Sequence, residues 1–234
     1  PAPVDAIGVS LGGNALLKWL GERSDAATGV VRRAPSISAP IDLPACGIAL
    51  DRGLNRLLYT RMFLSTLKPK SLAQLERFPA LFDGEKMRRA RTFREFDDLY
   101  TAPMHGFHGV DDYWTKAASA PWLAHIRVPT LVINARNDPF LPEAALVSAS
   151  RKAAPCVTLE LPRLGGHVGF RGAWLENRIL EEYYGPVLDT PTHEGAGHRW
   201  PAEQSADAES RAANGGGPYI SHAYPYRILT WPPA

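Results

Sequence analysis

Cysteine is scarce in this chain. Of 234 residues only two are cysteines, Cys46 and Cys156, and they are far apart and in no C-x-x-C spacing. We therefore expect neither a disulfide framework nor a cysteine-based zinc site. The default location for such a chain is a reducing compartment, the cytoplasm.

Long apolar runs and an excess of charge of one sign are also lacking. No run approaches the length of a membrane span, and no basic-then-apolar leader is visible. The 26 Lys and Arg residues nearly balance 24 Asp and Glu residues, and a net charge of +2 does not indicate nucleic acid as a partner. A hydrophobic content of 45% suits one globular domain that buries a sizeable core.

A glycine-rich stretch near the start carries the strongest motif. Residues 8–12 have the sequence G-V-S-L-G, with Ser10 at the centre, an apolar run before them and a helix-like run after them. This is the pattern of the nucleophile elbow, a strand-to-helix turn that exposes a serine. We expect Gly8 and Gly12 to be required because a bulky side chain at either flank would clash with the neighbouring strand and helix. The alternative is a glycine-rich turn with an incidental serine.

Two further residues follow predicted strands in the order that a catalytic triad on such an elbow requires. Asp138 comes after the apolar run 129–134, and His167 lies in a glycine-rich turn after 157–161. A serine hydroxyl needs a histidine to accept its proton and a carboxylate to orient the imidazole. Taken singly, the aspartate could be a helix cap and the histidine a turn residue. Together with Ser10 they favour a triad.

Strands and helices alternate along the chain. The predicted strands are 4–9, 30–41, 129–134 and 157–161, and the predicted helices are 11–19, 143–153 and 173–184. We expect Gly21 to end the first helix and the first strand to be buried. The alternation predicts an α/β fold with a mostly parallel sheet covered by helices on both faces. Because ligand sites lie at the carboxyl ends of parallel strands, Ser10, Asp138 and His167 should meet at one edge.

One insertion interrupts this alternation. Residues 45–118 have helical spacing without a clear strand, which predicts an inserted helical lid within a domain that spans 1–185. The composition of 186–234 shifts to Gly, Pro, Ala, His and Ser, and we expect a disordered tail there. Between Asp51 and Arg94, eleven Lys or Arg stand against four Asp or Glu. This charge would give a weak attraction to anionic lipid surfaces or acidic substrates; a solvated helical lid is the interpretation that we favour.

Other polar residues are expected to carry no chemistry. The H-x-x-H pair His105 and His108 lies beside a glycine and a proline, which favours a loop over a metal-binding helix. The aspartate pairs at 97–98 and 111–112 are adjacent in the sequence, and we interpret them as surface turns. The histidines of 186–234 are interpreted as solvated side chains and not as metal ligands.

Three motifs together resemble alpha/beta-hydrolase family 4, the YheT-type family of serine esterases. They are residues 8–14 around Ser10, residues 134–140 (N-A-R-N-D-P-F) and residues 165–170 (G-G-H-V-G-F), and the segments A-P-I-D-L and L-K-P-K also match. The resemblance covers about residues 4–184. It implies an alpha/beta-hydrolase fold and a hydrolase of carboxylic esters that needs no cofactor, with short-chain acyl esters or monoacylglycerols as substrates. It also implies Ser10, Asp138 and His167 as the charge-relay set.

The oxyanion site is the part of this chemistry for which the chain supplies least. The backbone N–H of Leu11 can donate one hydrogen bond, whereas members of the family take a second donor from a His-Gly loop before the elbow. We expect that segment to be missing before Pro1, so that 1–185 is a partial domain. Losing one donor lowers the rate about 100- to 1,000-fold, so we expect this chain alone to be a weak or inactive esterase that aggregates. Two alternatives stay open: a non-catalytic hydrolase-like module, and acyl transfer to an alcohol or amine instead of water.

Overall fold

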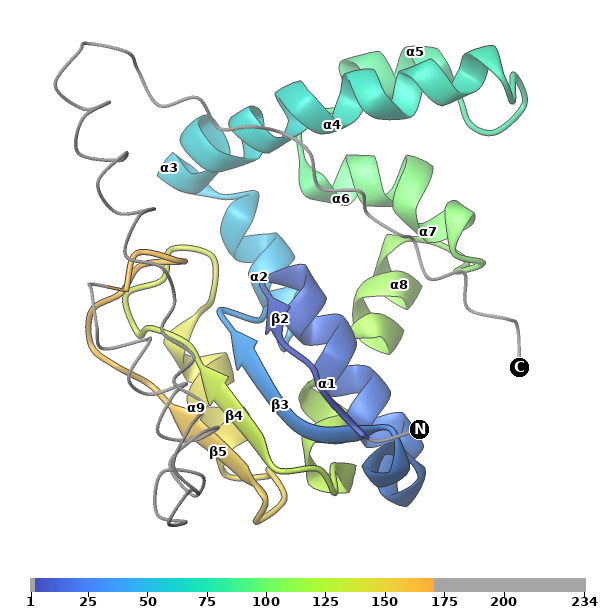
Figure 1. Ribbon diagram of the computed structural model, residues 1–234. Helices are drawn as coiled ribbons and strands as arrows, with labels where there is room; N and C mark the ends of the chain where they lie inside the picture. The colour runs from blue at the N-terminus through green and yellow to red at the C-terminus, as the bar shows by residue number, and fades with distance from the viewer. Residues whose placement is uncertain (1–2, 171–234) are drawn as a thin grey trace, which may run out of the picture. The chain divides into compact units, whose positions relative to one another are not determined.

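The computed structural model describes residues 3–170, which all belong to one compact unit (Figure 1). The helix predicted at 173–184 and the disordered tail predicted at 186–234 lie outside the described residues.

A parallel sheet forms the centre of this unit. Its strands are β1 Val4–Asp5, β2 Gly8–Val9, β3 Val31–Ile37, β4 Thr130–Ile133 and β5 Val157–Glu160. Both β1 and β2 pair with one side of β3, β4 pairs with the other side, and β5 pairs with β4, all in parallel. The arrowheads of β3 and β4 point toward the same end of the sheet (Figure 1). The predicted α/β fold with a mostly parallel sheet is confirmed.

The first predicted strand differs from the expectation. In place of one buried strand there are two short ones, and Ile7 between them is 58% exposed. Within residues 3–170 this segment pairs only with β3, which leaves its other side open. The backbone N–H groups of Ala34 and Ser38 donate hydrogen bonds on the β4 side of β3. Because successive residues of a strand point their N–H groups to opposite sides, the backbone nitrogen of Pro35 faces β1 and β2. Because proline has no N–H, the ladder is interrupted there.

The helix after the elbow, α1 Leu11–Arg23, is longer than predicted. Gly21 does not end it. A Cβ at Gly21 would lie 2.4 Å from the carbonyl oxygen of Trp122, so this glycine permits close packing against the segment before β4. Leu17 and Leu20 of α1 are fully buried and join the main core with side chains of the sheet, of Ala120–His125 and of α9 Glu143–Ser150. The sequence period identified the helix, but its end depends on this tertiary contact.

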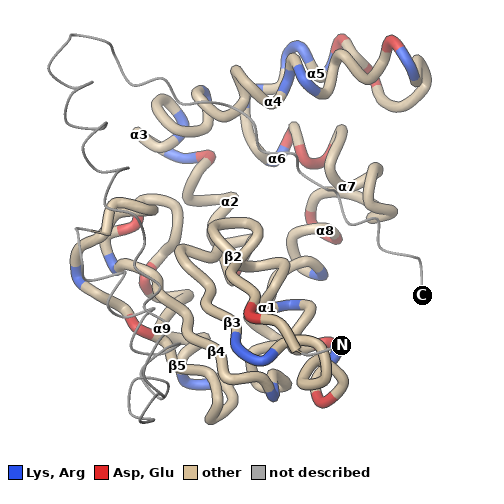
Figure 2. The backbone as a smooth tube through the Cα atoms, in the orientation of Figure 1, with Lys and Arg blue, Asp and Glu red and all other residues tan. Residues whose placement is uncertain are grey.

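The residues between β3 and β4 are helical, as predicted, and in the described chain they contain no strand. We call residues 43–117 the helical insertion. Its helices are α2 Leu43–Leu50, α3 Gly53–Asn55, the π-helical turn Arg56–Thr60, α4 Arg61–Ala73, α5 Gly84–Arg89, α6 Phe93–Phe96, α7 Ala102–Met104 and α8 Val110–Ala117. Lys and Arg positions are frequent along α4 and α5 (Figure 2).

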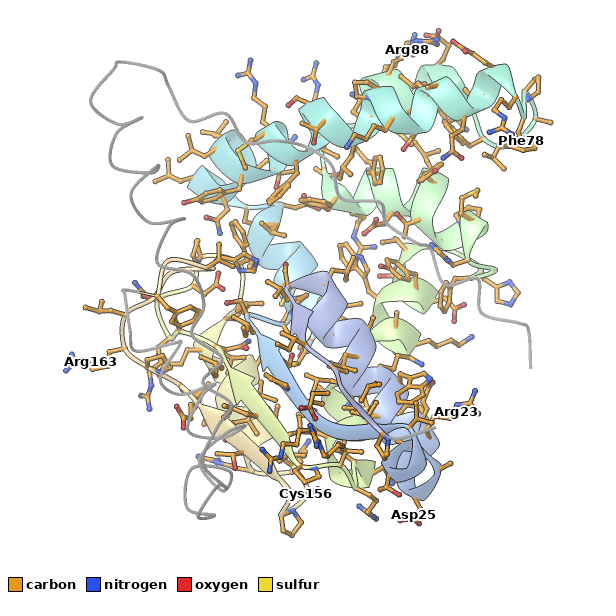
Figure 3. The ribbon with its side chains drawn as sticks, in the orientation of Figure 1. Arg23, Asp25, Phe78, Arg88, Cys156 and Arg163 are labelled. Carbon is orange, nitrogen blue, oxygen red and sulfur yellow. The ribbon has the colours of Figure 1, made fainter. Side chains whose placement is uncertain are left out.

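The far end of the helical insertion has its own small core. Leu64, Met87 and Phe96 are buried together there. Phe78 and Arg88 point outward from the same end (Figure 3). This end of the helical insertion therefore has a core of its own, whereas Cys46, Leu50, Tyr59 and Phe63 at its near end pack with the core of the sheet.

The prediction that Asp97 lies in a surface turn is wrong. Asp97 lies in a helical turn, and its carboxylate accepts hydrogen bonds from Trp114 Nε1 (2.8 Å) and Thr101 Oγ1 (2.6 Å). Burial raises the pKa of Asp97 to about 6. By contrast, Asp98 and Asp111 are exposed, as the sequence predicted, but Asp98 lies in the same helical turn and Asp111 lies in α8, so the predicted turns are wrong there too. Adjacent residues in a helix face different surroundings, so a carboxylate pair need not share one environment.

Candidate active site

Ser10 stands on a strained turn between β2 and α1. Its φ is 52° and its ψ is −127°, in a region that side chains rarely adopt. Its N–H donates to the carbonyl oxygen of Ile37 (2.8 Å), and its own carbonyl accepts from Gly13 N (2.9 Å). A conformation of this kind costs about 1–3 kcal/mol and persists where the surroundings over-determine it. The strand on one side and the helix on the other supply that constraint.

The structure requires glycine at positions 8 and 13 of the elbow, and not at 8 and 12 as predicted. A Cβ at Gly8 would lie 2.6 Å from Gly13 Cα, so the strand and the helix start too close together for any side chain. A Cβ at Gly13 would lie 2.6 Å from Ser36 Oγ. At Gly12 a Cβ would meet no described atom within 4 Å, and the predicted requirement there is wrong. The helix approaches β3 one residue later than the motif suggests.

The structure brings Ser10, Asp138 and His167 together. Ser10 follows β2, Asp138 lies between β4 and α9, and His167 follows β5. His167 Nε2 lies 2.9 Å from Ser10 Oγ, and His167 Nδ1 lies 2.7 Å from Asp138 Oδ2. Residues 157 positions apart in the sequence thus form one chain of hydrogen bonds. Their convergence follows from strand direction, because parallel strands end at the same edge.

The hydrogen bonds of Asp138 define the tautomer of His167. The Asp138 side chain is fully buried, and its Oδ1 accepts the N–H of Phe140 (2.9 Å). An ionised carboxylate can only accept, so His167 Nδ1 must donate to Oδ2. Nε2 is then the unprotonated nitrogen, and it accepts the hydroxyl proton of Ser10. This is the arrangement that proton transfer from a serine requires.

Leu11 is the first residue of α1. The N–H groups of the first helical turn have no acceptor within their own helix. The N–H of Leu11 has no acceptor among the described residues, whereas those of Gly13 and Asn14 donate to the Ser10 carbonyl. A free N–H beside Ser10 Oγ is suitably placed for an oxyanion.

Three residues that the sequence prediction missed tie the helical insertion to the triad. Asn55 donates to the carbonyl oxygen of Pro139 (2.7 Å), directly after Asp138. The rings of Tyr59 and Phe63 pack on Phe140 at centroid distances of 4.7 and 5.8 Å. The Phe140 ring in turn packs on the imidazole of His167 at 4.6 Å. These residues had no motif to mark them, because their role depends on how the insertion folds back.

The two cysteines are free thiols that lack the features of a nucleophile. Burial, with Asp42 and Asp138 nearby, raises the pKa of Cys46 to about 12, so its thiolate is negligible at neutral pH. Cys156 lies just before β5, at the end of the strand opposite to His167 (Figure 3). Ser10 is therefore the nucleophile candidate at this edge.

His105 and His108 lie in the loop between α7 and α8, as predicted. Among residues 3–170, no three His, Cys, Asp or Glu side chains come close enough together to hold a metal ion.

A parallel sheet with a serine on a strand-to-helix turn, followed in order by aspartate and histidine, is the architecture of the alpha/beta-hydrolases. No family model matches the chain. Curated proteins do match it: the chain is 36% identical over 187 residues to "Putative esterase YheT" of Escherichia coli (strain K12), covering 76% of this chain and 54% of that protein. The chain belongs to the alpha/beta-hydrolase family.

Two further relatives carry more specific names. The chain is 34% identical over 174 residues to "Phospholipase ABHD3" of Mus musculus, covering 74% of this chain and 42% of that protein. It is 30% identical over 196 residues to "Monoacylglycerol lipase" of Saccharomyces cerevisiae, covering 78% and 40%. The chain spans about half the length of the curated relatives it matches.

Proposed function

We propose that the protein hydrolyses carboxylic esters with Ser10 as nucleophile, His167 as general base and acid, and Asp138 as the residue that orients His167. The observation that carries the proposal is the unbroken chain of hydrogen bonds from Ser10 Oγ to the buried Asp138 carboxylate. The names of the relatives, an esterase, a phospholipase and a lipase, support an ester as substrate.

The reaction proceeds in two halves. Ser10 Oγ attacks the ester carbonyl carbon while its proton passes to His167 Nε2, and the resulting oxyanion accepts the N–H of Leu11. Collapse of the tetrahedral intermediate breaks the bond to the alkoxy group, which leaves as alcohol with the proton from Nε2. Water then attacks the acyl-enzyme with His167 as base, and the acid product leaves as Ser10 is restored.

The substrates that we propose are short-chain acyl esters and monoacylglycerols. Leu11, which supplies the oxyanion N–H, is itself about half exposed, so an ester can approach Ser10 from the solvent side in the described part of the chain. Monoacylglycerol is the substrate that one relative's name states.

The test compares two serines at opposite ends of α1. Ser10 and Ser24 both have a left-handed φ, 52° and 46°, but within residues 3–170 only Ser10 is hydrogen-bonded to a histidine. We expect Ser10→Ala to abolish hydrolysis of p-nitrophenyl acetate and of monoacylglycerol, and also labelling by a fluorophosphonate, while Ser24→Ala leaves both unchanged. Unchanged turnover in Ser10→Ala would refute the assignment. Product analysis with added alcohol separates hydrolysis from acyl transfer.

We also propose that the helical insertion makes a weak contact with anionic membrane surfaces. The apolar side chains of Leu54, Leu57, Leu58 and Met62 are 54–73% exposed and recur at the spacing of one helix face. Arg56 and Arg61 are exposed on the same stretch, and within the described residues neither forms a salt bridge. Apolar side chains flanked by cations are what an interfacial helix presents to lipid. No helix of the described residues is long and apolar enough to cross a membrane.

Vesicle sedimentation tests this contact. We expect the protein to sediment with vesicles of phosphatidylcholine and phosphatidylserine more than with phosphatidylcholine alone, and Leu57→Asp to reduce the bound fraction. Val30→Asp is the matched control, because it adds the same charge at a side chain that is 52% exposed but lies outside the helical insertion. Equal binding of Leu57→Asp and the unmodified protein would contradict the proposal.

A further inference from the structure

Ser38 occupies a special position between the strands that carry the triad. It is fully buried, it follows β3 directly, and its φ of 52° lies in the left-handed region. Its N–H donates to the carbonyl oxygen of Ile133 at the end of β4 (2.7 Å). Ser38 thus lies between the end of β2, which presents Ser10, and the end of β4, which leads to Asp138. A non-glycine residue in this conformation invites a functional explanation.

The hydroxyl of Ser38 donates a hydrogen bond to the backbone carbonyl oxygen of His167. The contact joins residues 129 positions apart in the sequence. His167 is held at its imidazole by Asp138, and this bond holds it at its main chain. Two separate points on one residue fix both the ring and the Cα from which the ring projects.

The backbone around Ser38 is itself fixed. The fully buried amide of Asn134 accepts the N–H of Ala39 (3.2 Å) and donates to the Ala39 carbonyl oxygen (2.8 Å). Asn134 directly follows β4, so both the N–H and the carbonyl group of Ala39 are bonded to the chain at the end of that strand. The Ser38 hydroxyl therefore projects from a rigid part of the sheet edge.

The loop that carries His167 is held less firmly without this bond. Gly166 has a φ of 56°, and its N–H donates to Asn137 Oδ1 (3.0 Å). Gly169 N donates to the Gly165 carbonyl oxygen (2.8 Å). A loop with three glycines in five residues has wide backbone freedom. The hydrogen bond from Ser38 restricts the backbone of this loop at His167 itself.

From this geometry we propose that Ser38 is a positioning residue, which holds the main chain of His167 so that Nε2 stays within hydrogen-bond distance of Ser10 Oγ. The inference rests on the proposed function of the triad. Misplacing a catalytic group by about 1 Å lowers a rate about 100-fold. Ser38 is fully buried and acts through its bond to the main chain of His167.

Ser36, two residues before Ser38 and inside β3, offers a matched control. Ser36 is also fully buried, but its Oγ has no hydrogen-bond partner among the described residues. Ser38→Ala and Ser36→Ala each remove one buried hydroxyl, and only the first breaks the bond to His167. Ser38→Gly removes the same hydroxyl while it relieves the backbone conformation, so it keeps the test usable if the alanine variant folds poorly.

Two measurements on the full chain test the proposal. The first is the rate constant for fluorophosphonate labelling, which we expect to fall about 10- to 100-fold in Ser38→Ala and in Ser38→Gly and to stay unchanged in Ser36→Ala. The second is the downfield proton resonance of His167 Nδ1–H, bonded to Asp138. We expect this resonance to broaden or vanish in both Ser38 variants and to persist in Ser36→Ala.

The outcomes separate this inference from the proposed function. A Ser38→Ala protein with an intact resonance and the unmodified labelling rate overturns the positioning role. If the unmodified protein is not labelled at all, the proposed nucleophile is wrong, and the resonance alone decides the role of Ser38. A loss of labelling in Ser36→Ala equal to that in Ser38→Ala assigns the effect to packing and also overturns the inference.

Discussion

Replacing Asp138 by Asn tests how the triad sets the tautomer of its histidine. The Asp138 carboxylate accepts one donor at each oxygen, the Phe140 N–H at Oδ1 and His167 Nδ1–H at Oδ2. An asparagine amide has an NH₂ group in place of one oxygen, so in either orientation a donor faces a donor. The backbone N–H of Phe140 cannot move its proton, whereas the imidazole can change tautomer. The amide therefore turns its NH₂ toward His167.

The new tautomer carries its proton on Nε2 and cannot accept the proton of Ser10. The same change in the serine-protease triad lowers kcat about 10⁴-fold, which corresponds to about 5 kcal/mol of transition-state stabilisation. We expect a similar loss in the fluorophosphonate labelling rate of Asp138→Asn. The substitution is nearly isosteric, and the hydrogen bond from Phe140 is kept, so we expect the melting temperature to change little.

Asp42→Asn is the matched control for this experiment. Asp42 caps α2 by accepting the N–H of Ala45 (3.0 Å), a role that asparagine performs equally well. It carries the same chemical change without contact to His167. A labelling rate of Asp138→Asn within about tenfold of the unmodified protein would refute the tautomer argument.

Four further substitutions test the burial of Asp97, the two glycines of the elbow and the contacts of Asn134. Burial raises the pKa of Asp97 to about 6 in the folded protein, above its ordinary value of 3.8. The folded state therefore holds the proton more tightly than the unfolded state, and the stability that this contributes below about pH 4 is lost as the pH rises through about 6. Asp97→Asn should therefore be more stable than the unmodified protein at pH 8, by ~1–3 kcal/mol, and equally stable at pH 4, as thermal melts at both values will measure. Gly8→Ala should destabilise the fold and abolish labelling because its Cβ meets backbone atoms at 2.6 and 2.8 Å, whereas Gly12→Ala should stay within about 1 kcal/mol in urea unfolding. Asn134→Ala should cost about 2–5 kcal/mol in the same assay because it leaves both polar groups of Ala39 buried and unpaired; a loss below that range would mean that the turn relaxes.

The sequence predicts the sheet and the convergence of Ser10, Asp138 and His167 because both depend on local patterns. The strand Thr130–Ile133 is a short apolar run that ends at a turn, and Ser10, Asp138 and His167 each follow such a run. Strand direction then places their side chains at one edge without any knowledge of packing. The expectation that three distant residues converge needs only the order of strands and helices.

The errors share a different cause. Gly21 lies inside α1 where Trp122 packs against it, and the carboxylate of Asp97 is shielded from solvent by Trp114, which lies 17 residues further along the chain. Both contacts join residues that are too far apart in the sequence for helical or strand periodicity to reveal them. The same holds for Asn55, which reaches Pro139 over 84 positions of sequence. Propensity and spacing describe a residue's neighbours in the chain, whereas these roles are decided by neighbours in space.

The position of the fluorophosphonate adduct in the chain identifies the nucleophile. Trypsin releases residues 1–18 as one peptide, whose only hydroxyl or thiol side chain is that of Ser10. We predict that labelling adds one phosphonyl group per chain to this peptide, and that prior unfolding of the protein prevents it. An adduct on any other peptide, or labelling that survives unfolding, would contradict the assignment of Ser10 as the nucleophile.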